Sequence, residues 1–423
     1  MNKEALERIR KNLDKLKEFG SPLYVYDYET LKTRCEEMKN FQDKLANALG
    51  KDVFMHYSTK ANSNPSILNV VKETKLSVNC MSPTELQLDK MAGFNKFHIL
   101  YVCNNIDEEE MSLVRDERID ICLDSISQVD TWGNLFPKTE IMVRINPGVI
   151  GVGHSEKVIT SGKATKFGIS EENLDQLFMV AEKHHLKITG VHQHLGSLFL
   201  NDKIEEYIAG VEAGLRIIKE HFTNSPIKTI DLGGGFGVPY KPDENHLNLG
   251  RVSNRLIDVL DPFLEEFPVE INNIYFEPGR YIPCEGGFLL GDVTATKNEN
   301  GINWVGTNLG MNQLVRPSMY DSYHEVSVLN NQAFDIVANV CGNVCESGDI
   351  MAKERRIKVP EIGDTIAVHN AGAYGYSMAS NYTGRLRPAE VMLYPDGNIE
   401  LIRKRETIDD LTRNIVYKQK VKK

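Results

Sequence analysis

Short hydrophobic stretches alternate with longer amphipathic stretches between about residues 50 and 280. The short stretches are rich in β-branched and aromatic residues, and each is separated from the next by enough chain for a helix. Eight such stretches match the strand count of a closed (β/α)8 barrel better than an open doubly wound sheet. The eight are VFMHYS (53–58), LSVNC (76–80), HILYV (98–102), DICLD (120–124), IMVRI (141–145), ITGVHQH (188–194), KTIDLG (228–233) and NIYFEP (273–278).

The pattern changes after Arg280, where Gly-, Val- and Asn-rich segments alternate with turn signals such as KNENG, YPDG and PEIGD. This pattern is typical of an antiparallel β domain. We therefore expect an α/β protein with a (β/α)8 TIM-type barrel over residues 30–280 and a β domain over residues 281–423 that completes the active site. The N-terminal residues 1–29 read as a charged helix followed by a strand, SPLYVYDYE (21–29), which we expect to join the β domain.

The composition is that of an ordinary globular enzyme, with 41% hydrophobic and 26% charged residues. The formal charge of 49 − 59 = −10 repels polyanions, so it gives no basis for nonspecific binding of nucleic acid. The N-terminal sequence lacks the apolar core of a signal peptide, and no later apolar run has the length of a membrane span. We expect a cytoplasmic location, with neither nucleic acid nor membrane as a partner.

Seven cysteines are scattered along the chain, an odd number without the close spacing of a disulfide framework, so we expect reduced thiols. Cys341 and Cys345 could form half of a zinc site. No second Cys/His pair stands at a matching spacing, so we expect no metal. Taken alone, Cys345 reads as a small buried residue and Arg316 as a surface charge.

Two glycine-containing segments follow the last two predicted barrel strands, GGGFG (233–237) and EPGR (277–280). Glycine lets backbone N–H groups approach an anion closely, and phosphate groups often bind after strands seven and eight of such barrels. Either segment alone could be a tight turn. Together, and in these two places, they predict a phosphate site.

Four polar side chains at the same end of the predicted barrel are candidates for catalysis or cofactor binding. Lys60 follows the first predicted strand and suits Schiff-base chemistry, although a lysine in this position is more often a solvated charge. His192 and His194 alternate on the sixth strand and should point the same way, and we favour a stacking or hydrogen-bonding role for His194. Glu277 could face a heterocyclic nitrogen, or could form a salt bridge with Arg280.

These segments, taken with others, resemble the fold-type III decarboxylases that depend on pyridoxal 5'-phosphate (PLP), and among them the diaminopimelate decarboxylase family, over nearly the whole chain. The ordered recurrence of so many motifs makes the resemblance specific. The motifs are YSTKAN (57–62), HSEKVITSGKATKFGI (154–169), HLGS (194–197), GGGFG (233–237), EPGR (277–280), RPSMY (316–320), CESGD (345–349) and GAYGYSMASNYTGRLRPAE (372–390).

The resemblance implies decarboxylation of meso-2,6-diaminopimelate to L-lysine by a homodimer with its active sites at the subunit interface. It implies that Lys60 carries PLP as a Schiff base, that His194 stacks on the cofactor ring and that Glu277 pairs with the pyridine nitrogen. Cys345 is implied to be the general acid, delivered by a partner subunit. The remaining implied contacts are Ser197, Gly234, Gly235, Gly237, Gly279, Arg280 and Tyr374 for the cofactor, and Arg280, Arg316, Tyr320, Glu346 and Tyr374 for the substrate.

Two alternatives remain: a decarboxylase for ornithine, lysine or arginine, and a non-catalytic regulator that binds PLP. A guanidinium clamp of Arg316 with Tyr320 argues against the first, because a distal amine needs acidic partners. Retention of Lys60 and Cys345 argues against the second. The chain also departs from the family pattern, with NCMSPTE (79–85) where many members have a glycine pair, and Leu198-Phe199 where a glutamine is usual. These departures indicate a subgroup.

Overall fold

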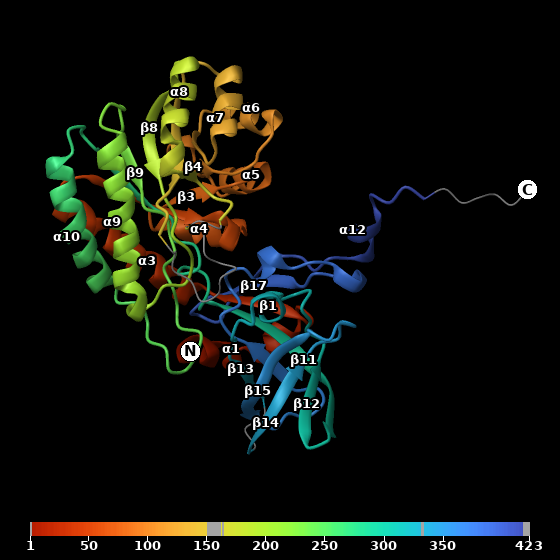
Figure 1. The fold of residues 1–423 in the computed structure, drawn as a ribbon. Helices are drawn as coiled ribbons and strands as arrows, with labels where there is room; N and C mark the ends of the chain where they lie inside the picture. Colours follow the sequence, from red (N-terminus) through yellow and green to blue (C-terminus); the bar gives the residue numbers. More distant parts are fainter. Residues whose placement is uncertain (1, 150–161, 163–164, 331–333, 418–423) are drawn as a thin grey trace, which may run out of the picture. The chain divides into compact units, whose positions relative to one another are not determined.

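The computed structural model describes residues 2–149, 162, 165–330 and 334–417. The chain forms two compact units, one made of Met1–Glu29 with Gly286–Lys423 and the other of Thr30–Glu285 (Figure 1). None of the helices in these ranges is long and apolar enough to cross a membrane.

The second unit is a closed barrel of eight parallel strands. Its strand order is β5-β4-β3-β2-β10-β9-β8-β6, and pairing of β5 with β6 closes the ring. Every predicted β-type stretch overlaps one of these strands, so the (β/α)8 prediction is confirmed. The strands are β2 (Asp52–Ser58), β3 (Ser77–Cys80), β4 (Ile99–Val102), β5 (Asp120–Leu123), β6 (Glu140–Asn146), β8 (Lys187–His192), β9 (Thr229–Asp231) and β10 (Asn273–Phe276).

Helices cover the outside of the strands (Figure 1). Five of them, α4, α5, α6, α7 and α10, begin after an Asn, Ser or Asp whose side chain accepts a backbone N–H of the first turn. Such N-caps satisfy N–H groups that have no partner inside the helix. The helices are α3 (Tyr28–Leu49), α4 (Pro65–Glu73), α5 (Pro83–Met91), α6 (Glu108–Glu117), α7 (Ile126–Leu135), α8 (Leu174–Lys183), α9 (Ile204–His221) and α10 (Leu249–Glu266), with short elements η1 (Thr59–Ala61), η2 (Lys96–His98), β7 (Ile169–Ser170), η4 (Glu171–Asn173) and η5 (Asn201–Lys203).

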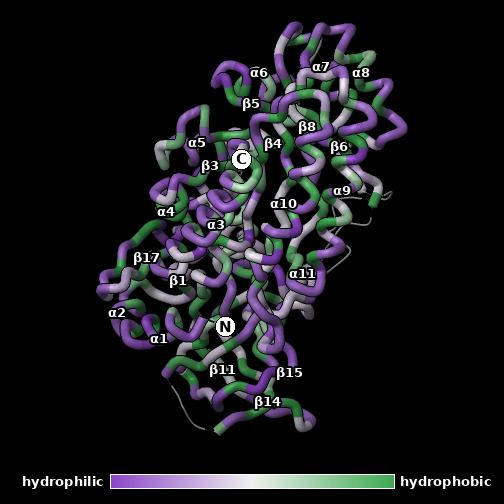
Figure 2. The backbone as a smooth tube through the Cα atoms, turned by 90° about the vertical axis from the view of Figure 1, so that its left-hand side faces the viewer, coloured by the Kyte–Doolittle hydropathy of each residue, from purple (hydrophilic) through white to green (hydrophobic). Residues whose placement is uncertain are grey.

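The barrel strands are buried on both faces, because one face lines the interior and the other packs against helices. In β6, for example, residues 141–145 are buried in succession. The helices instead alternate hydrophobic and hydrophilic residues along the chain (Figure 2). This difference in pattern made the strands recognisable in the sequence.

The first unit is a mixed, mostly antiparallel sheet domain. Strand β1 pairs antiparallel with β11 and parallel with β17, and β12 pairs parallel with β14. The N-terminal strand therefore lies inside the sheet formed by the C-terminal part of the chain. The elements are α1 (Lys3–Lys11), α2 (Leu13–Lys17), β1 (Leu23–Asp27), β11 (Gly287–Glu299), β12 (Ile302–Thr307), α11 (Arg316–Tyr320), β13 (Val326–Val328), β14 (Asp335–Cys341), β15 (Ile350–Lys358), β16 (Thr365–Val368), η6 (Tyr376–Met378), η7 (Tyr382–Gly384), β17 (Ala389–Leu393), β18 (Ile399–Arg403) and α12 (Ile408–Thr412).

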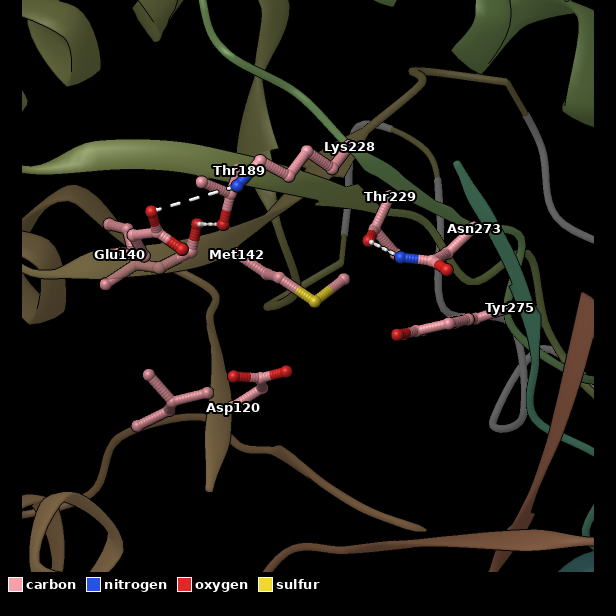
Figure 3. Close-up of a pocket in the computed structure, with 10 residues that line it drawn as sticks. Asp120, Glu140, Met142, Thr189, Lys228, Thr229, Asn273 and Tyr275 are labelled. Atoms are coloured by element: carbon pink, nitrogen blue, oxygen red, sulfur yellow. Dashed lines mark hydrogen bonds and ion pairs between the residues drawn. The ribbon is translucent and has the colours of Figure 1, made fainter. Parts of the chain in front are cut away.

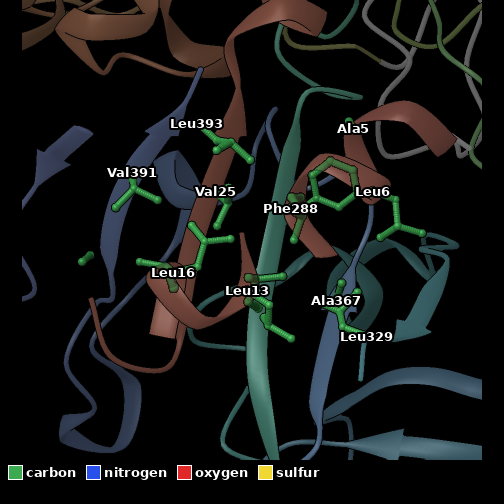
Figure 4. Close-up of a cluster of buried hydrophobic side chains, with 14 residues drawn as sticks. Ala5, Leu6, Leu13, Leu16, Val25, Phe288, Leu329, Ala367, Val391 and Leu393 are labelled. Carbon is green, nitrogen blue, oxygen red and sulfur yellow. The ribbon is translucent and has the colours of Figure 1, made fainter. Parts of the chain in front are cut away.

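The N-terminal helices supply part of the hydrophobic core of this unit. Leu6 and Leu13 pack with Val25 of β1, Phe288 of β11 and Val391 of β17 (Figure 4). Burial of one such side chain contributes roughly 1.5–3 kcal/mol. The charged helix at the start of the chain is therefore amphipathic and forms part of the folded domain.

Candidate active site

The carboxyl ends of the barrel strands bring the predicted lysine close to the EPGR segment. Lys60 lies in η1, directly after β2, and its side chain is exposed in the single chain. Two residues earlier, the Ser58 N–H donates to the carbonyl of Pro278 (3.0 Å) and the Ser58 hydroxyl donates to the carbonyl of Glu277 (3.3 Å). The end of β2 is therefore tied directly to the end of β10.

Glu277 is buried, and its Oε2 lies 3.3 Å from Nε2 of His192. Its Oε1 has no hydrogen-bond partner among the described residues. Burial acts to raise the pKa of Glu277, but the nearby His192, Lys60 and His194 outweigh it and hold that pKa below its ordinary value. The expected alternative, a salt bridge between Glu277 and Arg280, is not formed. The site therefore contains a buried, ionised carboxylate with one free oxygen.

His194 lies two residues beyond the end of β8, so the expectation that both histidines lie on the strand is wrong for His194. The loop instead turns its ring toward the glycine segment, where the N–H of Gly234 donates to His194 Nδ1 (3.0 Å). Burial and the charges of Lys60 and Arg144 lower the pKa of His194 well below its ordinary value. The imidazole is therefore neutral, with Nδ1 as the acceptor and the ring proton on Nε2.

The glycines after β9 are required by close contacts with neighbouring loops. A Cβ on Gly234 would lie 2.0 Å from the carbonyl oxygen of Glu277, and one on Gly237 would lie 2.5 Å from that of Phe199. Gly235 has a φ of +104°, which side chains rarely allow. The N–H groups of Gly235 and Gly279 donate to no acceptor in the described part of the chain. These two donors remain available to an anion.

Arg280 joins the EPGR segment to the HLGS loop. Its Nη1 donates to the Tyr240 hydroxyl (2.8 Å) and its Nη2 to the Ser197 hydroxyl (3.2 Å). The Arg280 side chain is 4% exposed, so its guanidinium is buried. A buried cation next to the glycine loop favours a bound anion.

The two departures from the family pattern have structural explanations. Cys80 ends β3, and Ser82 caps α5 with Pro83 at the first helical position, so this strand–helix junction needs no glycine pair. Phe199 is buried, with its ring stacked 4.3 Å from that of Tyr207, and its carbonyl accepts the N–H of Gly237. Both departures serve packing and local backbone structure.

Asp89 is a fully buried carboxyl next to the lysine segment. The Thr59 hydroxyl donates to its Oδ1 (2.8 Å). Burial raises the pKa of Asp89 to about 8, although the hydrogen bond from Thr59 opposes the shift. The residue therefore stays protonated at neutral pH and helps to fix the backbone beside Lys60.

Replacing Asp89 with Asn is expected to raise the stability relative to wild type by roughly 3–4 kcal/mol more at about pH 8 than at about pH 5. Because the pKa rises from 3.8 to about 8 on folding, the folded state binds more protons across this window and wild-type stability declines with rising pH. Asparagine cannot titrate, and its Oδ1 still accepts the Thr59 hydrogen bond. Urea unfolding of both proteins at about pH 5 and about pH 8 measures the effect. A stability difference that does not grow with pH would contradict it.

The predicted substrate residues of the β-sheet unit include a buried arginine. Arg316 is 2% exposed, so its reading as a surface charge is wrong. Its Nη2 donates to the Ser322 hydroxyl (3.1 Å), and its guanidinium lies 5.6 Å from the ring centroid of Tyr320. The structure thus brings Arg316 and Tyr320 together.

Cys345 and Glu346 are exposed in a turn, so the expectation of a buried Cys345 is also wrong. Asp349 holds this turn, because its carboxylate accepts the N–H groups of Val344 (2.7 Å) and Met311 (2.6 Å). Tyr374 is partly buried and has a φ of +56°, a strained conformation for a tyrosine. Such strain is tolerated most often at functional sites.

Part of one predicted motif cannot be placed. Of HSEKVITSGKATKFGI (154–169), residues 154–161 and 163–164 lie outside the described residues.

A polar pocket of about 150 Å³ lies at the opposite end of the barrel (Figure 3). Asp120, Glu140, Thr229 and Asn273, the first residues of four strands, line it. Active sites of this fold lie at the carboxyl ends of the strands, and the volume is below that of typical ligand pockets. We therefore exclude this pocket as the active site.

Comparison with known proteins agrees with the fold. The family model described as the pyridoxal binding domain of the pyridoxal-dependent decarboxylases matches residues 33–284, more than half of the chain. This match and the barrel define the chain as a PLP-dependent decarboxylase of fold type III.

The particular family follows from full-length relatives. Diaminopimelate decarboxylase from Methanothermobacter thermautotrophicus is 34% identical over 402 residues, which cover 94% of this chain and 92% of that protein. The enzyme from Aquifex aeolicus is also 34% identical, covering 92% and 90%. The chain belongs to the diaminopimelate decarboxylase family. The crystal structure of the Helicobacter pylori enzyme complexed with L-lysine matches with a TM-score of 0.84 at 30% identity, covering 95% of this chain and 98% of that chain.

The residues at the barrel mouth fit the cofactor of this family. The free Oε1 of Glu277 can accept from a protonated ring nitrogen, and the N–H groups of Gly235 and Gly279 can donate to a phosphate. A Cβ on Gly235 would lie 2.8 Å from the carbonyl oxygen of Gly196, so a side chain would disturb this cradle.

Three buried polar residues near Glu277 have no role in the motif-based prediction, namely Arg144, His192 and Asp231. The sequence does mark these residues, because each is a charged or polar residue inside an otherwise apolar strand, in VRI, VHQH and IDLG. Burial of such a group is costly unless it has a partner.

Proposed function

We propose that this chain converts meso-2,6-diaminopimelate to L-lysine and carbon dioxide, the last step of lysine biosynthesis, with PLP as cofactor. The supporting observation is that a lysine, a buried carboxylate with a free oxygen and a glycine-lined set of free N–H donors lie at the carboxyl end of one barrel. The chain carrying them is 34% identical, over most of its length, to a diaminopimelate decarboxylase.

Bound PLP supplies an electron sink for the electron pair released as carbon dioxide leaves. Lys60 would hold the cofactor covalently through Nζ, and Glu277 would keep the proton on the ring nitrogen. His194 would present a flat, neutral ring fixed by its bond from Gly234. Cys345 would then donate the proton from Sγ to the substrate carbon that lost its carboxylate.

The same proposal assigns the remaining predicted residues. Ser197, Gly234, Gly235, Gly237, Gly279, Arg280 and Tyr374 would hold the cofactor. Arg280, Arg316, Tyr320 and Tyr374 would bind the substrate, with Glu346 on its distal ammonium. An arginine suits a distal carboxylate because its planar fork binds both oxygens.

Replacing Arg316 with Ala is expected to raise KM for meso-diaminopimelate about 30- to 100-fold, since roughly 2–3 kcal/mol of charge-assisted hydrogen bonding is lost. The visible absorbance of bound PLP should be unchanged. Arg316→Lys is the matched variant, because it keeps the charge and most of the volume but loses the fork. Steady-state kinetics and a cofactor titration measure both effects. An unchanged KM would remove Arg316 from the substrate site.

We also propose a homodimer in which each site uses residues of both subunits, because Cys345 and Glu346 are exposed in the single chain. Mixing inactive Lys60→Ala and Cys345→Ala proteins should then restore about a quarter of wild-type activity, because half of the randomly formed dimers are mixed and each has one complete site. Light scattering should give the mass of a dimer. Mixtures that stay inactive while wild-type dimers exchange subunits would contradict the shared site.

A substrate panel tests the reaction. Purified protein with PLP is given meso-diaminopimelate, ornithine, lysine or arginine, and carbon dioxide release is measured. Release from meso-diaminopimelate alone supports the proposal; release from another amino acid supports the alternative decarboxylase, and cofactor binding without any release supports a regulator. A cytoplasmic location belongs to the same proposal, and the seven free thiols are compatible with a reducing compartment.

A further inference from the structure

A row of polar side chains lies on neighbouring barrel strands close to Glu277. In the parallel pairing of β6 with β8, Arg144 is the partner of His192, and in that of β8 with β9, His192 is the partner of Asp231. Paired residues of neighbouring parallel strands point to the same face. Their exposed fractions are 8%, 1% and 0%, so the whole row is buried.

That face is the barrel interior. His192 on β8 reaches Glu277 after β10, although β9 lies between these strands. Backbones two strands apart are separated by about 9–10 Å, so side chains can meet across an intervening strand only where they converge on the concave side. His192, Asp231 and Glu277 indeed place their polar atoms within 4.8 Å of one another.

We infer that His192 and Asp231 are positioning residues that act through Glu277: His192 engages Oε2, so that Oε1 is left to accept from the ring nitrogen of the cofactor that this site would hold. The inference rests on the proposed function, which gives Glu277 its role. His192 Nε2 lies 3.3 Å from Oε2, while Oε1 has no partner among the described residues. The two carboxylate oxygens therefore differ in what they can bind.

Asp231 carries the proton that this arrangement requires. Two carboxylates this close in a buried site cannot both ionise readily. Burial, together with the charge of Glu277, raises the pKa of Asp231 well above its ordinary value, against the opposing hydrogen bond from Gly233 and the charge of Arg144. Asp231 Oδ1 accepts the N–H of Gly233 (2.9 Å), so the neutral carboxyl also anchors the start of the glycine loop.

The trio also has the spacing of a metal site, but Arg144 contributes a positive charge to the same interior. A cation there would compete for the carboxylate of Glu277. Treatment with a chelator is therefore expected to leave PLP affinity unchanged, and a gain or loss of affinity after chelation would overturn the positioning role.

A double-mutant cycle tests the coupling of His192 to Glu277. The proteins are wild type, His192→Leu, Glu277→Gln and the double variant, with PLP affinity of the apoprotein, the visible band of bound PLP, kcat and KM as readouts. His192→Leu should weaken PLP affinity and lower kcat by about tenfold, whereas the same change in the Glu277→Gln background should have little further effect. Additive losses would overturn the inference.

His192→Gln is the control for a folding defect in His192→Leu, because the glutamine Nε2 can still donate to Glu277. It should recover most of the affinity lost by His192→Leu, and unfolding curves of the apoproteins should show that all variants fold. If wild-type protein binds PLP and releases carbon dioxide, and His192→Leu has the same PLP affinity and kcat, the inference alone fails. If wild-type protein binds no PLP, the proposed function fails and the inference fails with it.

Asp231→Asn tests where the proton resides. Asparagine is neutral and keeps an acceptor for the N–H of Gly233, so PLP affinity should stay within about threefold of wild type, whereas Glu277→Gln should lose far more. Equal losses in the two variants would show that Asp231 is ionised and would overturn this assignment. Asp231→Ala, which removes the acceptor, should destabilise the protein.

Discussion

Lys60→Ala protein is expected to lose the visible absorbance of covalently bound PLP and at least about a thousandfold of its decarboxylase activity, or about 4 kcal/mol of transition-state stabilisation. The amine is the group that would bind the cofactor covalently and exchange with the substrate amine. Its side chain follows β2 and is exposed in the single chain, so its removal leaves no cavity in the core. Absorbance spectroscopy of the protein with added PLP, and carbon dioxide release, measure the two losses.

Lys60→Arg is the matched control, because it keeps the positive charge but cannot form the covalent bond under ordinary conditions. It should lose the band and the activity as Lys60→Ala does, while the charge acting on Glu277 is retained. Lys90→Ala, on α5, should behave as wild type. A covalent cofactor band that persists in Lys60→Ala would show that another amine carries PLP.

The fold could be predicted because strand periodicity is local. Each barrel strand was recognisable as a short apolar run, and most errors were at the ends. The stretch ITGVHQH (188–194) was too long, because β8 ends at His192 and the backbone then turns so that His194 meets Gly234. Strand β9 likewise ends at Asp231, whose carboxylate accepts the N–H of Gly233 as the glycine loop begins.

The division between the two units depends on contacts that the sequence does not show. The change of pattern falls after Arg280, but the barrel unit continues to Glu285. Glu285 forms an ion pair with Arg34 of α3 (2.8 Å), and the Cys284 thiol lies 3.1 Å from the Tyr240 hydroxyl. These long-range contacts hold the segment against the barrel.

The row of buried polar residues next to Glu277 could not be predicted from the sequence. Arg144, His192 and Asp231 are far apart in the chain and adjacent only through strand register. The contact between His192 and Glu277 further requires the barrel to close, since β9 separates their strands. Sequence motifs predict which groups would bind the cofactor, whereas closure of the barrel determines which buried residues contact those groups. For this reason a role could be predicted for Glu277 from its motif, but none for His192.

Cys345→Ala is expected to lower kcat about 100- to 1,000-fold with little change in KM or in the absorbance of bound PLP, because general acid catalysis commonly contributes factors of this size. The turn that carries Cys345 is held by the backbone bonds of Asp349, so loss of the thiol should leave the turn in place.

Cys341→Ala is the matched control. Cys341 lies four residues before Cys345, and its thiol donates to the carbonyl of Val305 (3.6 Å). It should retain wild-type kcat, because the Cys341 thiol only contacts the neighbouring strand of the sheet. Cys345→Ser should remain far below wild type, since a hydroxyl is a much weaker acid than a thiol. Stopped assays of lysine formation across the pH range compare the four proteins. A kcat for Cys345→Ala equal to that of Cys341→Ala would exclude Cys345 as the proton donor, and the proton would then have to come from another group or from water.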